Sequence, residues 1–300
     1  MKAPVRIHII LARGAKTAMV IRQGPSKWVC TLLWDRRKDT FKIGQWFRGG
    51  IEGLRSDLSP DGKHFLYFAR DYKFNEKREN SFADCDEWIQ QIGKRKHPYA
   101  WTAISQVPYI KAIGFWPNAG GGFFLSNKSY WLNGGIFPWR DYKGDRLPPH
   151  LLDRAPNHLK RQKDSPFDPD FGTNCTDLYY HRLQRDGWRL IGREDDNRDR
   201  CTLFEKVLPK GWKLRKIAHD TSRPLKGKDS QYEAYSLHHA EQHLTLSFPD
   251  WEWADLDRER LVWTQDGILS ASKITPNGLD LVQQLYDFNP MTFEPIEAPY

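Results

Sequence analysis

The sequence predicts an all-β protein, and three observations support this fold class: the composition, a tandem repeat and several strand–turn–strand segments. The 300 residues include 13 Trp, 12 Tyr and 16 Phe, together with 22 Gly, 19 Pro and only 3 Met. Aromatic residues favour β-strands, whereas Gly and Pro favour the tight turns that join them. The composition therefore indicates many short strands rather than long helices.

The first candidate strand runs from Val5 to Leu11. It is apolar apart from Arg6 and His8, and it falls well short of the roughly 18 apolar residues that a membrane-spanning helix needs. It also lacks the organisation of a convincing signal peptide. We interpret it as a strand of a soluble protein that does not contact a membrane.

Further along the chain, several segments read as two strands joined by a turn. Asp57–Phe68 contains a Pro-Asp-Gly turn before an apolar strand, Asp255–Trp263 repeats its outline, and Ile113–Leu125 is a looser version. Trp263–Ile274 reads as a hairpin with its turn at Asp266–Gly267. Asp-Gly between two alternating runs is a strong hairpin signal.

A tandem repeat with a period of 24 residues lies in the second half of the chain. Tyr180–Leu190 and Phe204–Leu214 both begin with an aromatic residue and both contain Gly-Trp, then a basic residue and Leu. We expect the copies to form consecutive hairpins of one sheet, with Trp188 and Trp212 in equivalent positions. Two hairpins make four strands, which is the size of one blade of a β-propeller.

A short motif supports the same fold. The stretch D-x-S-P-D-G-K that begins at Asp57 resembles the repeats of TolB-like and WD-type β-propellers. The resemblance implies a propeller in which the Asp and Pro set the turn and the next strand runs near the middle of a blade, but it implies no activity. Because 57 residues separate Leu58 from Phe115, we expect five or six blades with insertions, forming a single domain over residues 1–300.

Two long insertions, at 71–97 and 138–176, interrupt the strand pattern. The first is highly charged and the second is rich in Pro. Long insertions in a compact domain are often functional loops, and basic side chains near aromatic ones can hold a partner. The candidate partner-binding residues are Lys94, Arg95, Lys96, Trp101, Lys160, Arg161 and Lys163. The alternative is that these charges only keep the loops solvated.

Charge is distributed unevenly around the net value of +8. Residues 1–56 carry twelve Lys and Arg against three acids, a charge of +9, whereas residues 245–300 carry three against ten, a charge of −7. One interpretation is that the ends attract each other where the N-terminal and C-terminal strands pair within one blade and close the propeller. The other is that the basic start is a binding surface for an acidic partner.

Motifs for chemistry are sparse. His238, His239 and His243 are the only histidine cluster, and the alternating flanks place them around a hairpin turn rather than on a helix. No carboxylate stands at the H-E-x-x-H spacing, so we expect a polar turn and keep a metal site only as a weak alternative. No sequence motif marks a catalytic nucleophile, and no cofactor is predicted.

The cysteines indicate a cellular setting. Cys30, Cys85, Cys175 and Cys201 contain no C-x-x-C pair. Neither a disulfide framework nor a zinc knuckle is indicated, and a reducing cytoplasm fits this pattern best.

These observations lead to one main hypothesis and two alternatives. The main hypothesis is a non-catalytic, cytoplasmic propeller that binds a protein or peptide through loops on one rim. The first alternative is an enzyme with a metal or hydrolytic site at the central channel. The second is a nucleic-acid-binding propeller that uses the basic loops.

Overall fold

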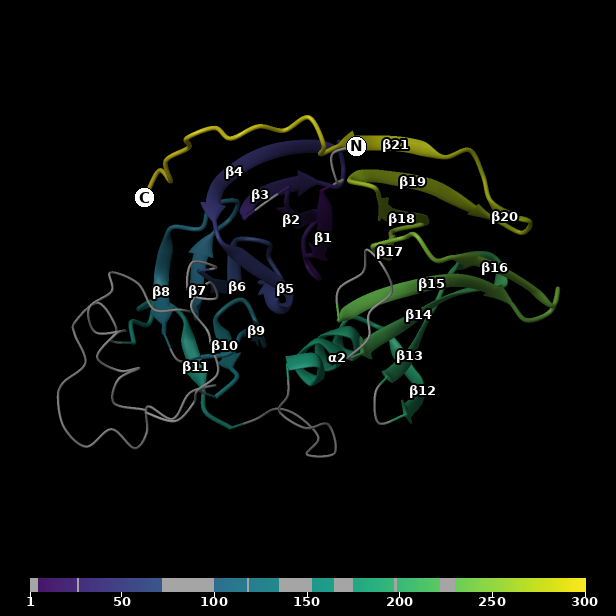
Figure 1. Cartoon of the computed structure of the whole chain (residues 1–300), viewed down its shortest axis with the longest axis horizontal. Helices are drawn as coiled ribbons and strands as arrows, with labels where there is room; N and C mark the ends of the chain where they lie inside the picture. Colours follow the sequence, from purple (N-terminus) through teal and green to yellow (C-terminus); the bar gives the residue numbers. More distant parts are fainter. Residues whose placement is uncertain are drawn as a thin grey trace. The chain divides into compact units, whose positions relative to one another are not determined.

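The computed structural model describes residues 5–25, 27–71, 100–117, 119–134, 153–164, 175–196, 199–221 and 230–300. Strands dominate these ranges, and α2 (Cys175–Arg185) is the α-helix among them (Figure 1). Within the same ranges, no helix has both the length and the apolar character that crossing a membrane would require.

The first half of the chain forms two four-stranded antiparallel sheets in which each strand pairs with the next one in sequence. The first sheet contains β1 (Arg6–Leu11), β2 (Thr17–Gln23), β3 (Trp28–Asp35) and β4 (Thr40–Arg48). The second contains β5 (Gly50–Leu58), β6 (His64–Arg70), β7 (Ala100–Gln106) and β8 (Ala112–Trp116).

A smaller sheet follows and contains a parallel strand pair. It consists of β9 (Gly122–Phe124), β10 (Ser129–Leu132) and β11 (Lys160–Gln162). Strand β10 lies in the middle, antiparallel to β9 and parallel to β11. Part of the predicted insertion at 138–176 is therefore a strand of a sheet.

Two further antiparallel sheets contain the strands of the second half. One has β12 (Arg189–Asp196), β13 (Asp199–Val207), β14 (Trp212–Thr221), β15 (Gln231–His239) and β16 (Leu244–Phe248), in sequence order. The other has β17 (Trp253–Asp257), β18 (Arg260–Gln265), β19 (Ile268–Thr275), β20 (Gly278–Leu279) and β21 (Gln283–Asp287), with β20 and β21 both paired to β19.

These sheets confirm the all-β prediction. Successive antiparallel meanders of four or five strands are the units from which β-propellers are built. The number of blades, five or six from the sequence, stays a prediction.

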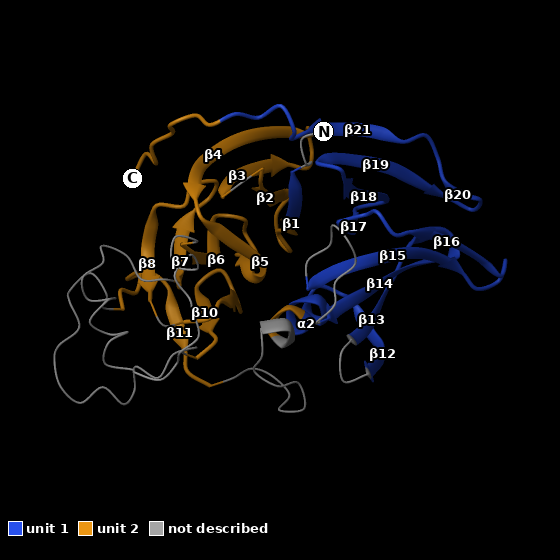
Figure 2. Cartoon of the chain, in the orientation of Figure 1, with its two compact units in different colours: residues 1–8, 180–292 blue, residues 9–179, 293–300 orange. Residues whose placement is uncertain are grey.

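The chain divides into two compact units (Figure 2). Unit 1 comprises residues 1–8 and 180–292, and unit 2 comprises residues 9–179 and 293–300. Each unit thus contains one end of the chain together with a stretch that is distant in sequence. The prediction of a single domain stays a prediction.

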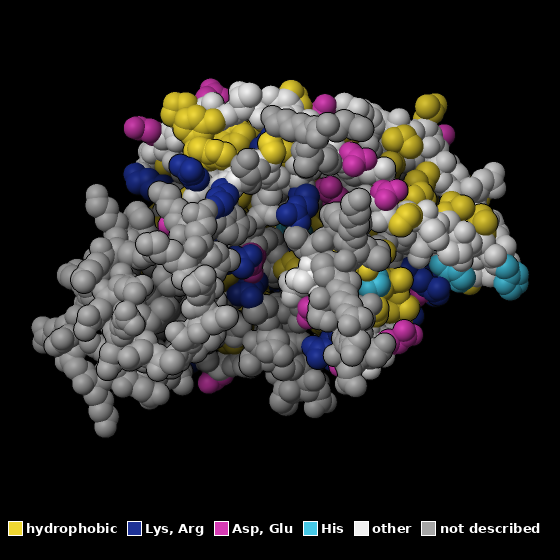
Figure 3. Space-filling model, viewed as in Figure 1, with side chains coloured by type: hydrophobic (Ala, Val, Ile, Leu, Met, Phe, Trp, Pro, Cys, Tyr) yellow, Lys and Arg dark blue, Asp and Glu magenta, His cyan; other side chains and the backbone are white. Residues whose placement is uncertain are grey.

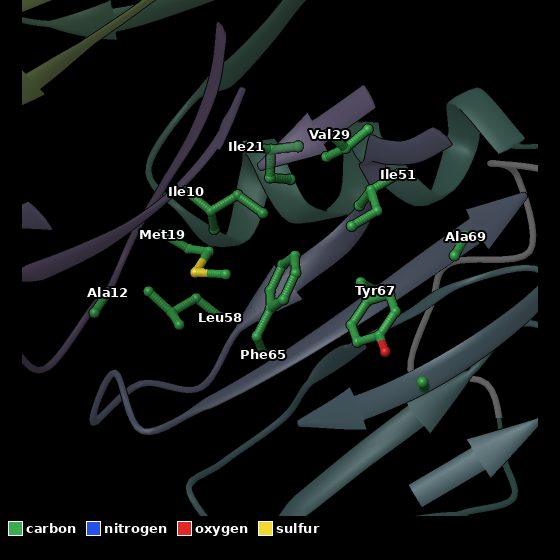
Figure 4. Close-up of a cluster of buried hydrophobic side chains, with 11 residues drawn as sticks. Ile10, Ala12, Met19, Ile21, Val29, Ile51, Leu58, Phe65, Tyr67 and Ala69 are labelled. Carbon is green, nitrogen blue, oxygen red and sulfur yellow. The ribbon is translucent and has the colours of Figure 1, made fainter. Parts of the chain in front are cut away.

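A hydrophobic cluster in unit 2 illustrates how strand alternation builds the core. Met19 and Ile21 on β2 and Phe65 and Tyr67 on β6 all point into this cluster (Figure 4). Residues two apart in a strand share a face. Phe65 and Tyr67 also stack, with ring centroids 5.3 Å apart, and both are almost completely buried.

Both predicted Gly-containing turns are confirmed. Residues 59–63 connect β5 to β6, and Gly62 has the left-handed φ of +69°. Residues 266 and 267 connect β18 to β19 with φ values of +51° and +75°, as a two-residue type I′ hairpin turn requires.

The first copy of the tandem repeat was predicted to be a hairpin, and this is wrong. Its first half is the end of helix α2, whereas the second copy is the predicted pair β13 and β14. Leu178, Tyr179, Arg182 and Leu183 are buried at helical spacing. Gly187, with φ +89°, terminates the helix, because the N–H of Trp188 bonds to the carbonyl of Leu183 in a Schellman arrangement.

The looser strand–turn–strand segment at Ile113–Leu125 is also corrected. Its two strands, β8 and β9, belong to different sheets. The Gly-rich stretch between them, where Gly121 has φ +104°, is a connection between sheets rather than a hairpin turn.

Among the described residues, the predicted pairing of the N-terminal strand with C-terminal strands is not formed. Strand β1 pairs with β2. Instead, side chains from the C-terminal part of unit 1 form hydrogen bonds with backbone groups of the N-terminal segment. The N–H of Val5 donates to Asn289 at 3.3 Å, the N–H of Ile7 donates to Glu252 at 3.1 Å, and Thr264 donates to the carbonyl of Ile7 at 3.5 Å.

Candidate functional site

Part of the second predicted partner loop is well defined, and we call residues 153–164 the strap. Phe115 on β8 and Arg154 exchange two backbone hydrogen bonds of 2.7 and 2.8 Å. Pro156 is buried against Gly114, where a Cβ would approach the proline ring to 2.7 Å. Leu159 packs into the hydrophobic cluster of unit 2 that includes Phe124. The strap is therefore held by backbone and apolar contacts at several points.

Three of the predicted binding residues lie on or beside the strap's strand. Lys160 and Arg161 are in β11, Lys163 follows it, and all three are exposed. With Arg154 and two carboxylates, Asp153 and Asp164, the strap carries a net charge of +2 from four cations and two acids. Its surface is basic.

Strand β11 is also an edge strand. The sheet order is β11–β10–β9, so one edge of β11 faces no other strand among the described residues. Lys160 donates its backbone N–H to the carbonyl of Lys128 at 2.8 Å, on the β10 side. Because successive residues of a strand direct their backbone groups to opposite edges, Arg161 presents its N–H and carbonyl to the open edge.

Partial burial shifts the pKa of two groups at the strap. Burial raises the pKa of Asp153, and the nearby Arg161, whose guanidinium lies 3.9 Å from the carboxylate, partly opposes this. Burial raises the pKa of the Tyr130 hydroxyl to about 12, again with Arg161 opposing the shift. Arg161 thus lowers the pKa of both groups.

Two histidines meet where the strap crosses β6. The Nε2 atoms of His64 and His158 lie 3.1 Å apart, so one ring donates a hydrogen bond to the other. The pKa of His64 is lowered by burial and, secondarily, by His158. This pair was missed because the two residues are 94 positions apart.

Among the other predicted partner-binding residues, the structure describes Trp101, which packs inside unit 2. Lys94, Arg95 and Lys96 lie outside the described residues. Trp101 is on β7 and is partly buried, with its ring 5.7 Å from that of Phe47. A tryptophan packed in this way contributes to the core of unit 2.

The three clustered histidines lie around the turn between β15 and β16, as predicted. Figure 3 shows exposed histidine side chains on the face that it displays. They do not converge. His238 contacts Thr245, His243 is exposed, and His239 is buried with its ring 5.1 Å from that of Trp212. The described residues contain no group of three or more His, Cys, Asp or Glu side chains arranged to hold a metal ion.

Unit 1 contains a buried ionic cluster that the sequence did not reveal. Lys216 donates to Glu233 at 3.0 Å, and Lys206 pairs with Asp255 at 2.5 Å. The ammonium groups of Lys206 and Lys216 lie 5.0 and 4.8 Å, respectively, from the ring centroid of Trp188. Burial lowers the pKa of Lys216, and Glu233 opposes this shift.

This cluster mixes side chains that an enzyme could use, but its charges pair with one another. Such networks perturb pKa values for structural reasons as well as for catalysis. We therefore interpret it as part of the packing of unit 1. The signal that could have revealed it is the strand period, which places Lys206, Lys216 and Glu233 on the same face as the buried Phe204, Leu214 and Tyr235 of their strands.

A comparison with protein-family models and with curated proteins finds no match to this chain. Among solved structures, the β-propeller domain of the Trilobed protease from Pyrococcus furiosus is similar at 9% identity and a TM-score of 0.30, with 96% of this chain and 100% of that chain covered. A structure of prolyl endopeptidases gives 6% identity and 0.23, with 92% and 35% covered. The tricorn protease gives 6% and 0.18, with 93% and 27% covered.

Proposed function

We propose that the protein is a non-catalytic β-propeller scaffold that binds an extended, acidic segment of a protein partner by strand addition to β11. The observation that carries the proposal is the open edge of β11, flanked by the exposed cations Lys160, Arg161 and Lys163. Strand addition gives affinity through backbone hydrogen bonds, and side chains give selectivity. Acidic side chains suit this edge because the strap is basic.

The proposal includes a relation to the TolB-like and WD-type propellers and a cytoplasmic location. The first is supported by the segment that begins at Asp57, which folds into the predicted strand, turn and strand. The second is supported by Cys30 and Cys201, which are both thiols.

The test compares peptides and variants by fluorescence anisotropy. A labelled ten-residue peptide of alternating Glu and Val should bind with a Kd at least about tenfold lower than the same peptide with Lys in place of Glu. Arg161→Pro should weaken acidic-peptide binding by a similar factor, because it removes the N–H that faces the open edge and keeps the bonds of β11 to β10. Lys273→Glu, which reverses an exposed cation on β19, is the matched control and should have little effect.

Two results would contradict strand addition. One is an Arg161→Pro variant that binds the acidic peptide as well as the unmodified protein does. The other is a protein that prefers a single-stranded oligonucleotide, with an affinity that falls steeply with salt, and ignores the acidic peptide. The second result would favour the nucleic-acid alternative.

A further inference from the structure

A thiol and an imidazole face each other on the sheet β12–β16 of unit 1. Cys201 on β13 is directly opposite His219 on β14, which is directly opposite Tyr232 on β15. Directly opposed residues in an antiparallel sheet place their side chains on the same face. The Sγ of Cys201 lies 3.2 Å from the Nδ1 of His219, and the ring of Tyr232 stacks on the imidazole at 4.4 Å with 11° between the planes.

This geometry favours a reactive sulfur. A thiol that hydrogen-bonds an imidazole can transfer its proton to the ring, and the resulting thiolate is the nucleophilic form of cysteine. The stacked Tyr232 holds the imidazole plane in place, so that Nδ1 stays directed at the sulfur. Cys201 is also partly exposed, which gives small molecules access.

We propose that Cys201 is a site of covalent modification by small hydroperoxides, with His219 as its proton acceptor. The sulfur attacks one peroxide oxygen, so that an S–O bond forms and the O–O bond breaks. The leaving oxygen takes the proton from the His219 ring and departs as water or an alcohol. The sulfur is oxidised by two electrons to a sulfenic acid, and the peroxide is reduced by two electrons.

The surroundings of the pair are mixed. Glu194 on β12 is directly opposite Cys201 and is the carboxylate on this row, and the phenol of Tyr232 is at the other end. The neighbouring pair on the same face, two residues along each strand, is apolar and consists of Leu203 opposite Ile217. A carboxylate stabilises the protonated imidazole and opposes the thiolate.

Cys30 provides an internal reference within the same chain. It is fully buried on β3, and burial raises its pKa to about 12. Its Sγ lies 3.6 Å from the carbonyl of Thr31, and no histidine among the described residues contacts it. A thiol in this setting is inert toward oxidants.

The experiment exposes the full chain to hydrogen peroxide in the presence of dimedone and measures each cysteine separately by peptide mass spectrometry. At pH 7, Cys201 should be labelled at least about tenfold faster than Cys30. His219→Asn, which keeps a polar group near the position of Nδ1 but cannot take up a proton, should slow the labelling of Cys201 about fivefold or more. His238→Asn, a histidine elsewhere on the same sheet, is the matched control and should not change the rate.

Equal labelling of Cys201 and Cys30 would overturn the proposal, and so would an unchanged rate in His219→Asn. If that variant fails to fold, the pH dependence of iodoacetamide alkylation at Cys201 in the unmodified protein decides. A midpoint clearly below roughly 8.5, the value of an ordinary thiol, supports the pair, and a midpoint at or above it overturns it.

Discussion

At the scale of single residues, buried charges fix connections between strands that are distant in sequence. Asp57 is the second-last residue of β5 and lies within the motif that resembles propeller repeats, and its side chain is completely buried. Its carboxylate accepts the backbone N–H of Phe124 at 2.7 Å, so it ties β9 to β5. The turn itself is closed by Ser59, whose hydroxyl donates to Asp61 at 2.7 Å and accepts the N–H of His64 at 2.9 Å.

Asp57→Ala should therefore cost more than the loss of a turn contact. It leaves the buried N–H of Phe124 without its acceptor, which lowers the free energy of unfolding by about 1–3 kcal/mol. Asp57→Asn keeps an acceptor oxygen and should cost less. Asp61→Ala, at the more accessible turn, should stay below about 1 kcal/mol. Urea denaturation measures all three, and equal losses for Asp57→Ala and Asp61→Ala would show that Asp57 acts only in the turn.

Glu205 gives a prediction for the dependence of stability on pH. Burial raises the pKa of Glu205, but hydrogen bonds from Lys213, Arg189 and Arg215 together lower it by more, so the net shift of the pKa is downward. A carboxylate with a lowered pKa in the folded state adds stability above its unfolded pKa, near 4.5, and this stability is lost as the pH falls through the folded value.

The measurement compares Glu205→Gln with the unmodified protein by chemical denaturation. At pH 7 the variant should be less stable by about 1–3 kcal/mol, and the difference should shrink as the pH falls below about 4.5. Glu241→Gln, at an exposed position in the β15–β16 turn, should stay within about 0.5 kcal/mol at each pH. A difference for Glu205→Gln that is constant with pH would contradict the ionic account.

At the scale of elements, the two Gly-Trp pairs show how one sequence pattern serves two structures. Gly187 ends helix α2, whereas Gly211 lies in the turn between β13 and β14. Both glycines have left-handed φ values, +89° and +79°, and both precede a buried Trp, which directly precedes β12 in the first copy and begins β14 in the second. The repeat therefore encodes the entry of a strand, and the element that comes before it can differ.

The two glycines should differ when each is replaced by Ala. In Gly187→Ala the new Cβ would lie 4.0 Å from the side chain of Lys206, an ordinary van der Waals contact, so the variant should cost about 1–2 kcal/mol for the left-handed conformation alone. In Gly211→Ala the new Cβ would lie 2.8 Å from Nε2 of His239, a ring held by the carbonyl of Lys210, so the loss should be clearly larger. Gly192→Ala, with no such constraint, is the control. Equal melting temperatures for the first two variants would contradict this account.

The same contrast explains which features the sequence could predict. The Asp266–Gly267 turn and the turn after Leu58 depend on local backbone preferences, which neighbouring residues determine. Helix α2 was missed because the repeat copy covers only the end of the helix, and over so few residues Tyr180, Arg182 and Gln184 resemble one face of an alternating strand. The burial of the helix follows the helical period. The pairs His64–His158 and Cys201–His219 depend on strand register and on long connections, which no local pattern determines.

At the scale of the whole molecule, the ends of the described chain are integral to the packing. Residues 5–8 contact the C-terminal sheet of unit 1 through Asn289, Glu252 and Thr264. The C-terminal tail belongs to unit 2, where Phe293 lies 5.0 Å from the ring of Trp28 and the hydroxyl of Tyr300 donates to the carbonyl of Lys111 at 2.8 Å. Long-range contacts of both ends therefore complete the two units.

Deleting residues 1–12 should be severe, because it removes β1 from the first sheet and the contacts of Val5 and Ile7 in unit 1. We expect the truncated chain to lack a cooperative melting transition in circular dichroism. Salt at 0.5 M should lower the melting temperature of the full chain only slightly, because exposed ion pairs contribute about 0–1 kcal/mol each. A truncated chain that melts like the full chain would show that the N-terminal strand is dispensable.

The division of each unit between early and late parts of the chain has a consequence for folding during synthesis. Residues 5–8 leave the ribosome long before the strands of 180–292 that they contact, and unit 2 lacks its tail until residues 293–300 emerge. At roughly 5–20 residues per second, the wait is on the order of tens of seconds. Each unit can therefore reach its final packing only after its late residues have emerged, so the contacts of residues 5–8 within unit 1 form late in synthesis.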